Sequence, residues 1–173
     1  MAHREAVLIT IPEAVNTAIY NEKLACERYR DIAEFLYKAD NKDAGDFFID
    51  QSNRELGHYN SLIKFRDKRH IKEGVPALGE SLRWLTPEGG SGVEIRADMN
   101  LHDALILVEE MESGAEKFYR DMAEKAEDLD AKELFIKLAV DESHHHYLAR
   151  KLQAIYELKG KIEPVDFDDL GFE

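Results

Sequence analysis

The sequence contains a single cysteine, Cys26, and it lacks long apolar runs. One cysteine excludes a disulfide within the chain and any zinc or iron–sulfur site built from cysteines. No apolar run approaches the ~20 residues of a membrane span, and the N-terminal AVLIT is shorter than the about 7–15 residues of a signal-peptide core. These absences predict a cytoplasmic protein without a membrane partner, and Cys26 is interpreted as an inert, small apolar residue.

Basic residues are in the minority, with 23 lysines and arginines against 36 aspartates and glutamates and a net charge of −13. This balance argues against nucleic acid and anionic membrane surfaces as partners and favours cations. Hydrophobic residues make up 44% and charged residues 34% of the chain, which is typical of a globular protein with a charged surface. The 173 residues are predicted to form one domain, residues 1–173, with its own core.

Glycine and proline are also few, at 10 and 4 residues. Most of them gather in residues 74–92 and near the C-terminus. Between these breaks the apolar residues follow four helical patterns, at about 12–39, 43–68, 100–127 and 130–159. Thr10 and Glu13 have the spacing of a capping box, which predicts the start of the first helix.

The lengths of the connections predict how these helices are arranged. Short connections after the first and third helices favour two antiparallel hairpins, whereas residues 69–99 form a crossover long enough to run the length of a bundle. The sequence therefore predicts an all-α, antiparallel four-helix bundle in up–down–down–up order, followed by a C-terminal tail at 160–173.

Each helical pattern has an apolar stripe that is interrupted near its middle by a glutamate. Two of these glutamates are followed three residues later by a histidine on the same helical face. In the run of three histidines at 144–146, only the central one lies on the stripe, because its neighbours point about 100° to either side. The six interrupting residues are Glu22, Glu55, His58, Glu112, Glu142 and His145.

Four glutamates at one depth of a core require a counter-charge. Each isolated charge costs several kcal/mol to bury, like charges raise one another's pKa, and no lysine or arginine lies on any of the four stripes. Two divalent metal ions would balance four carboxylates with two neutral imidazoles. Such a ligand set suits iron or manganese, whereas structural zinc usually takes four ligands.

The two halves of the sequence repeat this arrangement. A glutamate followed seven residues later by a tyrosine occurs in the first and third helices, and Glu-x-x-His occurs in the second and fourth. The offset between copies is 90 residues for the first pattern and 87 for the second. One Glu-x-x-His is common by chance, but two copies in matching order strengthen the prediction of a symmetric two-metal site. The tyrosines are Tyr29 and Tyr119.

The segments EKLACERYRDIAEF, RELGHYNSL, MESGAEKFYRDMAEKA and DESHHHYLARKL resemble the ferritin-like di-iron carboxylate superfamily, and within it the rubrerythrin-like proteins. The resemblance covers about 12–158 and implies a ferritin-like bundle with two iron ions per chain, with manganese or a mixed pair as the alternatives. It implies that the terminal ligands are Glu22 and Glu112, the bridging ligands Glu55 and Glu142, and the imidazole ligands His58 and His145.

The resemblance also suggests residues around the metals. Tyr29 and Tyr119 correspond to tyrosines that hydrogen-bond near the metals in that family, and core packing with a satisfied hydroxyl is the alternative. Asp141 is a candidate hydrogen-bond partner for His58. Its counterpart in the first half is Arg54, so the surroundings of the two metals are not fully symmetric.

Three features depart from the relatives. The chain has no rubredoxin domain, which supplies electrons in rubrerythrins. Ala115 stands where rubrerythrins have a further glutamate, and the adjacent Glu116 is expected to be a surface charge. About 13 residues follow the fourth helix, where a cage-forming ferritin would have a short fifth helix.

The resemblance implies a non-haem di-iron oxidoreductase that reacts with hydrogen peroxide or O2 and depends on an external electron donor. An iron-binding or storage protein with ferroxidase activity is the alternative, and a bundle whose polar layer holds no metal is a third reading. Bundles of this kind often pair along exposed helices, so we expect a homodimer.

Overall fold

The computed structural model describes residues 10–74, 76 and 95–159 of the chain. These residues form four helices and no strand, as predicted for an all-α bundle. The observed helix ends differ from the predicted ends by no more than two residues. Most of the predicted crossover and the whole tail at 160–173 lie outside the described residues. The helices are α1 (Ile11–Lys38), α2 (Lys42–Lys68), α3 (Leu101–Lys125) and α4 (Leu129–Lys159).

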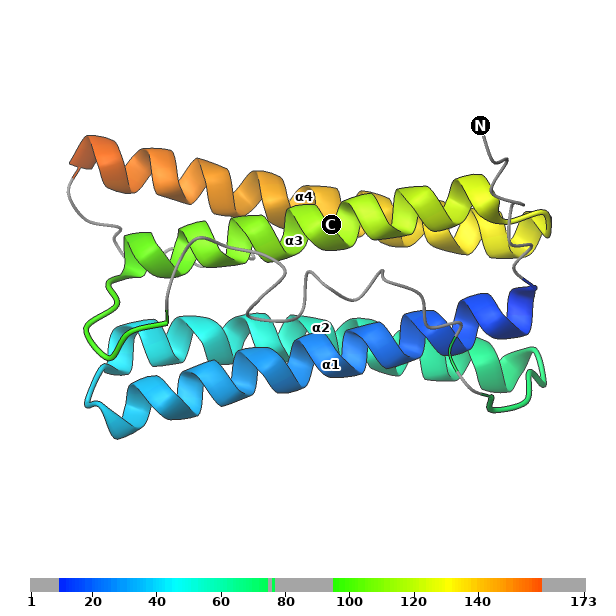
Figure 1. Ribbon diagram of the computed structural model, residues 1–173, viewed down its shortest axis with the longest axis horizontal. Helices are drawn as coiled ribbons and strands as arrows, with labels where there is room; N and C mark the ends of the chain where they lie inside the picture. The colour runs from blue at the N-terminus through cyan, green and yellow to red at the C-terminus, as the bar shows by residue number, and fades with distance from the viewer. Residues whose placement is uncertain (1–9, 75, 77–94, 160–173) are drawn as a thin grey trace, which may run out of the picture.

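The four helices form two antiparallel hairpins that lie side by side (Figure 1). α1 packs mainly against α2, and α3 packs mainly against α4. α2 and α3 run in the same direction along the bundle (Figure 1). The up–down–down–up order is therefore confirmed, since only this order makes the second and third helices parallel.

The N-terminus of α1 has the predicted capping box. The backbone N–H of Thr10 donates to the carboxylate of Glu13 at 2.9 Å, and the Thr10 hydroxyl accepts from the backbone N–H of Glu13 at 3.5 Å. These two bonds satisfy backbone groups that a helix start otherwise leaves without partners. The first turn of α1 is thereby fixed three turns before Glu22.

Two asparagine side chains attach the helices to the described ends of the crossover. Asn16 on α1 donates to the carbonyl oxygen of Lys72 at 3.1 Å, just after α2. Asn41, which precedes α2, donates to the carbonyl oxygens of Ala97 at 3.1 Å and Met99 at 2.6 Å, just before α3. The chain therefore leaves α2 at one end of the bundle and enters α3 at the other end.

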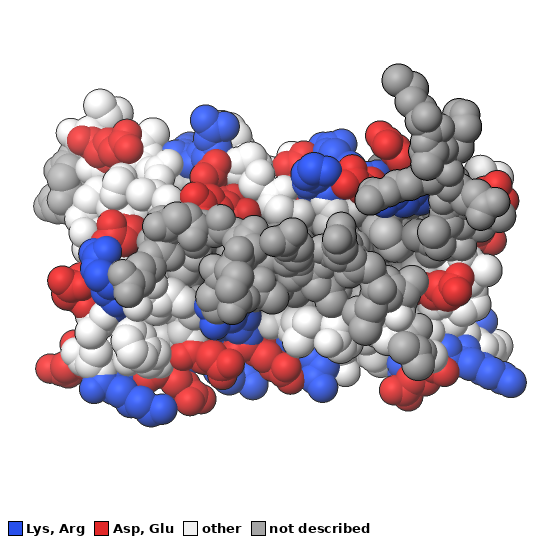
Figure 2. Space-filling model, viewed as in Figure 1, with Lys and Arg blue, Asp and Glu red and all other residues white. Residues whose placement is uncertain are grey.

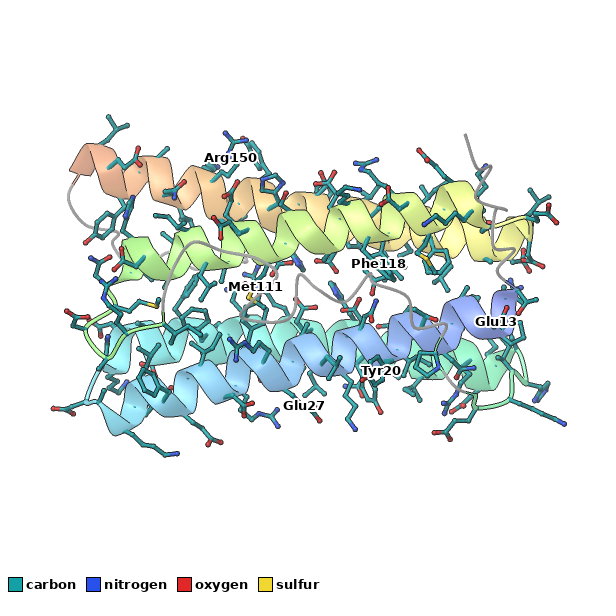
Figure 3. The ribbon with its side chains drawn as sticks, viewed as in Figure 1. Glu13, Tyr20, Glu27, Met111, Phe118 and Arg150 are labelled. Carbon is teal, nitrogen blue, oxygen red and sulfur yellow. The ribbon has the colours of Figure 1, made fainter. Side chains whose placement is uncertain are left out.

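The apolar core is divided into two clusters by a polar layer. One cluster includes Phe118 and Phe135, and the other includes Phe48 and Leu105. In Figure 3, Phe118 and Met111 point into the space between the hairpins, on either side of the middle of α3. Four carboxylates are buried in the layer between these clusters. Because buried charges are costly without partners, this layer needs hydrogen bonds or a counter-charge.

The surface carries many charged side chains, as the composition predicts. Acidic and basic side chains are interspersed along both long edges of the visible face (Figure 2). Within residues 10–74 and 95–159, the structure contains no helix that is long and apolar enough to cross a membrane.

Candidate metal centre

The four stripe glutamates meet in the polar layer, one from each helix. Their exposed fractions are only 1–3%. The side chains of His58 and His145 are 20% and 17% exposed, so the two imidazoles lie at the edges of the layer. All six residues that the sequence singled out are brought together. The four glutamates are Glu22, Glu55, Glu112 and Glu142.

The six side chains form two overlapping groups of four. In each group, one ligand atom per residue lies within 4.8 Å of all the others. Both groups contain Glu55 and Glu142, so these two carboxylates lie between the two positions. This is the arrangement expected of two metals with two shared ligands. The first group adds Glu22 and His58, and the second adds Glu112 and His145.

The two histidines face the carboxylates in nearly the same way. His58 Nδ1 lies 3.3 Å from Glu22, and His145 Nδ1 lies 3.6 Å from Glu112. Each Nδ1 is also 3.5 Å from the glutamate one turn earlier on its own helix. The rings stack with centroids 5.1 Å apart and planes 2° apart. The internal repeat in the sequence therefore appears as a pseudo-twofold in the site.

Three atoms that point into this space have no hydrogen-bond partner among residues 10–74, 76 and 95–159: Oε1 of Glu55, Oε2 of Glu142 and Nδ1 of His145. Buried polar atoms are normally satisfied, so unpartnered lone pairs that converge on one place require an explanation. Carboxylate oxygens and imidazole nitrogens with free lone pairs are what a divalent metal ion binds. The residues present therefore fit a pair of metals.

Without a metal, protons must supply the positive charge. Burial, together with the neighbouring carboxylates, raises the pKa of Glu142 to about 7 and that of Glu55 well above its usual range. Burial acts against charge on Glu112 as well, but its contact with His145 dominates and lowers the Glu112 pKa to about 2. Burial opposes charge on His145, yet Glu112 and Glu142 raise its pKa to about 10. Metal binding would replace these protons.

Two buried tyrosines hold the outer carboxylates across the hairpins. Tyr29 on α1 donates to Glu112 Oε1 on α3 at 2.6 Å, and Tyr119 on α3 donates to Glu22 Oε1 on α1. Burial raises the pKa of both phenols well above the usual value, so they stay protonated and act as donors. Each hairpin therefore orients a predicted ligand of the other hairpin.

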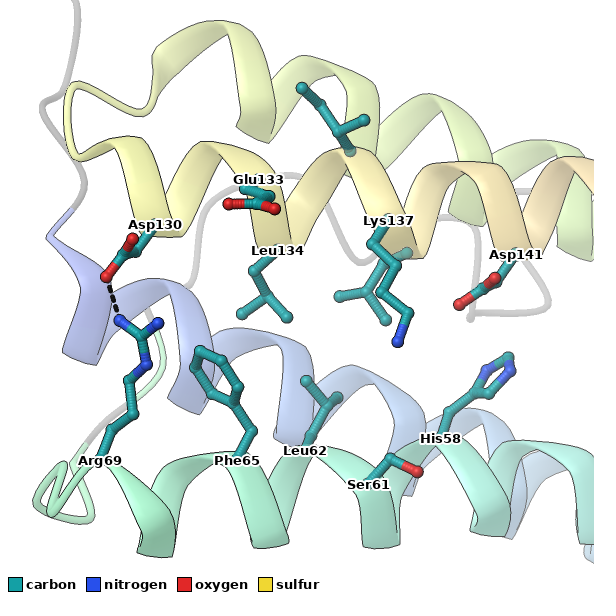
Figure 4. A pocket seen from close by; sticks show the side chains of 12 residues that line it. His58, Ser61, Leu62, Phe65, Arg69, Asp130, Glu133, Leu134, Lys137 and Asp141 are labelled. Carbon is teal, nitrogen blue, oxygen red and sulfur yellow. Dashed lines mark hydrogen bonds and ion pairs between the residues drawn. The ribbon is translucent and has the colours of Figure 1, made fainter.

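The space behind His58 is open. A pocket of about 560 Å³ lies between α2 and α4, with His58 at its inner end and the Arg69–Asp130 ion pair at its far end (Figure 4). Asp141 lies across this pocket from the His58 ring (Figure 4). Among the described residues no hydrogen bond joins these two side chains, so their predicted pairing stays a prediction.

The space behind His145 is nearly filled. The cavity there measures about 10 Å³, and its walls include Phe47, Leu105 and Leu148. Arg54 also lines it, at the position that corresponds to Asp141 in the other half. The two imidazoles therefore have similar carboxylate neighbours but different surroundings.

A third cavity, also about 10 Å³, adjoins the four carboxylates, and its other lining residues come from α1 and α3. Ala25 and Ala115 form part of its wall, and Ala115 is the position where rubrerythrins have a further glutamate. Asn21 lines the same cavity; the sequence analysis missed this residue, although it lies directly before Glu22.

The remaining predicted residues lie outside the cluster. His144 is exposed, and His146 lies 2.9 Å from Glu109 and 3.3 Å from Glu116. Glu116, which was expected to be a solvated surface charge, is instead partly buried in this pair. Cys26 is buried, with its Sγ 3.3 Å from the hydroxyl of Ser52, which suits a packing role.

The sequence matches the Rubrerythrin family over residues 13–153. The chain belongs to the rubrerythrin family. Among solved structures, this rubrerythrin-family chain is similar to an uncharacterised conserved protein from Magnetospirillum magnetotacticum MS-1, with a TM-score of 0.63 and 21% identity over 90% of this chain and 98% of the other. At that identity the likeness supports the ferritin-like fold alone. Among curated proteins, none matches the chain.

Proposed function

We propose that this chain is a non-haem di-iron protein that reacts with hydrogen peroxide or O2 and takes electrons from an external donor. The observation that carries the proposal is the pair of four-residue groups that share Glu55 and Glu142. Membership of the rubrerythrin family supports it. A manganese or mixed pair would use the same ligands, because carboxylate and imidazole suit both metals.

The chain's own residues would divide the work of holding the metals. Glu22 and His58 would bind one ion, Glu112 and His145 the other, and the shared glutamates would lie between them. Tyr29 and Tyr119 would keep the outer carboxylates in place through the hydrogen bonds that they donate. These bonds occupy Oε1 of each outer carboxylate, whereas Oε2 faces the histidine that would bind the same metal.

The proposed reaction balances in electrons and protons. Hydrogen peroxide takes up two electrons and two protons and leaves as two water molecules. A bound pair of ferrous ions would supply the two electrons, one from each ion, and the external donor would return them. The cavity beside Ala25 and Ala115 measures about 10 Å³, so it admits only a small molecule. It therefore favours a small oxidant over an organic substrate.

The test is anaerobic loading with ferrous iron, followed by elemental analysis and stopped-flow absorbance on mixing with peroxide or O2. We expect about two irons per chain, as in other two-metal sites, and oxidation of both by at least one of the two oxidants. The Glu55→Gln/Glu142→Gln variant is the control and should bind little iron. Uptake of far more iron than two per chain would instead favour storage, and absence of binding would contradict the proposal.

A further inference from the structure

A buried amide lies beside the proposed metal centre. Asn21 is 1% exposed, and within the described part of the chain neither its Nδ2 nor its Oδ1 makes a hydrogen bond. Asn16, on the same helix, is also buried, but its Nδ2 donates to the carbonyl oxygens of Pro12 at 2.8 Å and Lys72 at 3.1 Å. Leaving a buried amide unsatisfied costs free energy. The contrast with Asn16 indicates that the Asn21 amide serves something other than the fold.

The Asn21 side chain lines the small cavity that adjoins Glu22, Glu55, Glu112 and Glu142. The other walls include two alanines, which offer no hydrogen bond, and Tyr29, whose hydroxyl is already donated to Glu112. The carboxylates can only accept hydrogen bonds when ionised. Among the described wall residues, Asn21 therefore offers an uncommitted donor as well as an uncommitted acceptor.

We propose that Asn21 binds hydrogen peroxide in this cavity: Nδ2 donates to a peroxide oxygen, and Oδ1 accepts from a peroxide O–H. Hydrogen peroxide both donates and accepts hydrogen bonds, so it satisfies both halves of the amide. O2 has no hydrogen and leaves Oδ1 unsatisfied. The inference rests on the proposed function and deepens it, because it assigns a residue that binds one of the two oxidants.

Asn21→Leu tests this, because leucine has a similar volume and no polar atom. In the full-length, iron-loaded protein we expect the reaction with peroxide to slow at least tenfold, while the reaction with O2 changes less than twofold. Optical titration of the oxidised protein with peroxide should show affinity weakened to a similar degree. Iron content should stay at the wild-type value, because Asn21 is not a proposed ligand.

Melting of the metal-free variants separates binding from folding. Asn21→Leu should melt at or above the wild-type temperature, because it removes an unsatisfied amide. Asn16→Leu, the matched control, should melt lower, because it removes two hydrogen bonds. A variant at Asn21 that lost stability as Asn16→Leu does would overturn the inference and assign the amide to the fold.

The kinetic outcomes also distinguish this inference from the proposed function. If the wild-type protein reacts with peroxide and Asn21→Leu reacts equally fast, the inference is wrong and the proposed function stands. Equal slowing with peroxide and O2 would also overturn the inference, because it would show a general effect on the metals. If the wild-type protein bound no iron, both would fail together.

A second observation, on the outside of α4, carries an independent inference. Five apolar residues of α4 are between 42% and 87% exposed. At about 100° per residue they fall within a sector of about 40°, opposite buried residues such as Leu138 and Ala149. A helix that is apolar on opposite faces is typical of one covered on both. These five residues, here called the outer stripe, are Leu129, Ile136, Val140, Tyr147 and Leu158.

Four of the five outer-stripe residues pair with one another when the helix is reversed, and Ile136 lies opposite Lys151. The pairs 129/158 and 140/147 share one midpoint, so an end-over-end rotation brings Leu129 against Leu158 and Val140 against Tyr147. Glu133 and Lys151 lie on the same edge of the stripe, and the rotation brings each near the other in the second copy. We infer that α4 pairs with α4 of a second copy of this chain in antiparallel orientation, since charge and apolar residues both match.

Light scattering on the full-length protein tests this pairing. We expect twice the chain mass of 19.9 kDa, and a single chain mass for Val140→Glu/Tyr147→Glu. Leu56→Glu, at an exposed apolar residue of α2, is the control and should keep the dimer. Glu133→Lys should weaken the dimer, and adding Lys151→Glu should restore it. A wild-type monomer, or a dimer that survives the double glutamate variant, would overturn the inference.

Discussion

The two sides of the proposed metal centre have similar carboxylate neighbours and different surroundings. On the His58 side, a pocket of about 560 Å³ extends between α2 and α4, with Asp141 on its wall. On the His145 side, the space measures about 10 Å³ and is closed in by Phe47, Leu105 and Leu148. Arg54 occupies the position that Asp141 holds in the other half. The internal repeat therefore reproduces the ligands but not what lies behind them.

This difference has a chemical consequence. A carboxylate near an imidazole ligand strengthens it as a donor to a metal, and a cation does the opposite. In the proposed centre, the metal beside His58 should therefore be bound more tightly. It should also be more accessible to solvent through the pocket. The position bound by His145 should be weaker and better shielded.

The largest effect should come from removing a shared ligand, because this affects both metal positions. Glu55→Ala or Glu142→Ala removes a ligand from both positions, so we expect both metals to be lost. Glu22→Ala and Glu112→Ala each remove a ligand from one position and should leave about one metal per chain. Elemental analysis after loading and desalting measures this. Equal losses from all four variants would contradict the shared role of Glu55 and Glu142.

Removing one imidazole should expose the difference between the two sides. His58→Gly and His145→Gly should each lose about one metal. Added imidazole should restore it only in His58→Gly, because only the pocket behind His58 has room to admit the ring. Metal content measured with and without imidazole decides this. Rescue of His145→Gly, or of neither variant, would show that the pocket does not give access.

A smaller effect is expected from Asp141. Asp141→Asn should lower the affinity of one of the two metals about tenfold, the lower end of the range for residues that support a metal ligand. Asp130→Asn is a matched control in the same pocket, because Asp130 pairs with Arg69 at the far end. Competition with a coloured chelator measures both affinities. If both substitutions lowered the metal affinity equally, the cause would be the overall charge of the pocket and not a specific role of Asp141.

The smallest effect concerns the metal-free protein and pH. The folded-state pKa is raised for Glu142, from 4.5 to about 7, and for His145, from 6.5 to about 10. A raised pKa gives stability that is complete below the unfolded value and is lost as pH rises through the folded value. The melting temperature without metal should therefore fall between about pH 5 and pH 9.

Glu112, with a pKa lowered to about 2, acts in the opposite sense but only at pH below its ordinary value of 4.5. Metal replaces the bound protons, so the rise in melting temperature on loading should grow with pH. Calorimetry across this range checks both trends. A melting temperature without metal that increased from pH 5 to pH 9 would contradict the account of the charges.

The helices and the six clustered residues could be predicted because they follow local rules. Apolar spacing and the glycine and proline breaks define the helices, and four core-facing glutamates without a lysine or arginine leave few other interpretations. The repeat placed Tyr29 and Tyr119 near the centre, and the structure adds that each one bonds a carboxylate of the opposite hairpin. The roles of the six clustered residues as metal ligands, and of the two tyrosines as their supports, stay predictions.

What the sequence did not reveal depends on how the helices pack. Asn21 looks like an ordinary polar residue next to Glu22, and its burial follows only from how the helices pack around it. The pocket behind His58 depends on which side chains of α2 and α4 fail to fill the gap. Glu116 looks like a surface charge, because its pairing with His146 requires the register between α3 and α4.

The central claim is most directly tested by a crystal structure of the iron-loaded protein with anomalous diffraction measured at the iron edge. The account predicts two anomalous peaks per chain, about 3.5–4 Å apart, both in contact with Glu55 and Glu142. Glu22 and His58 should contact one peak, and Glu112 and His145 the other. A single peak, or carboxylates turned to solvent with no peak between them, would contradict it.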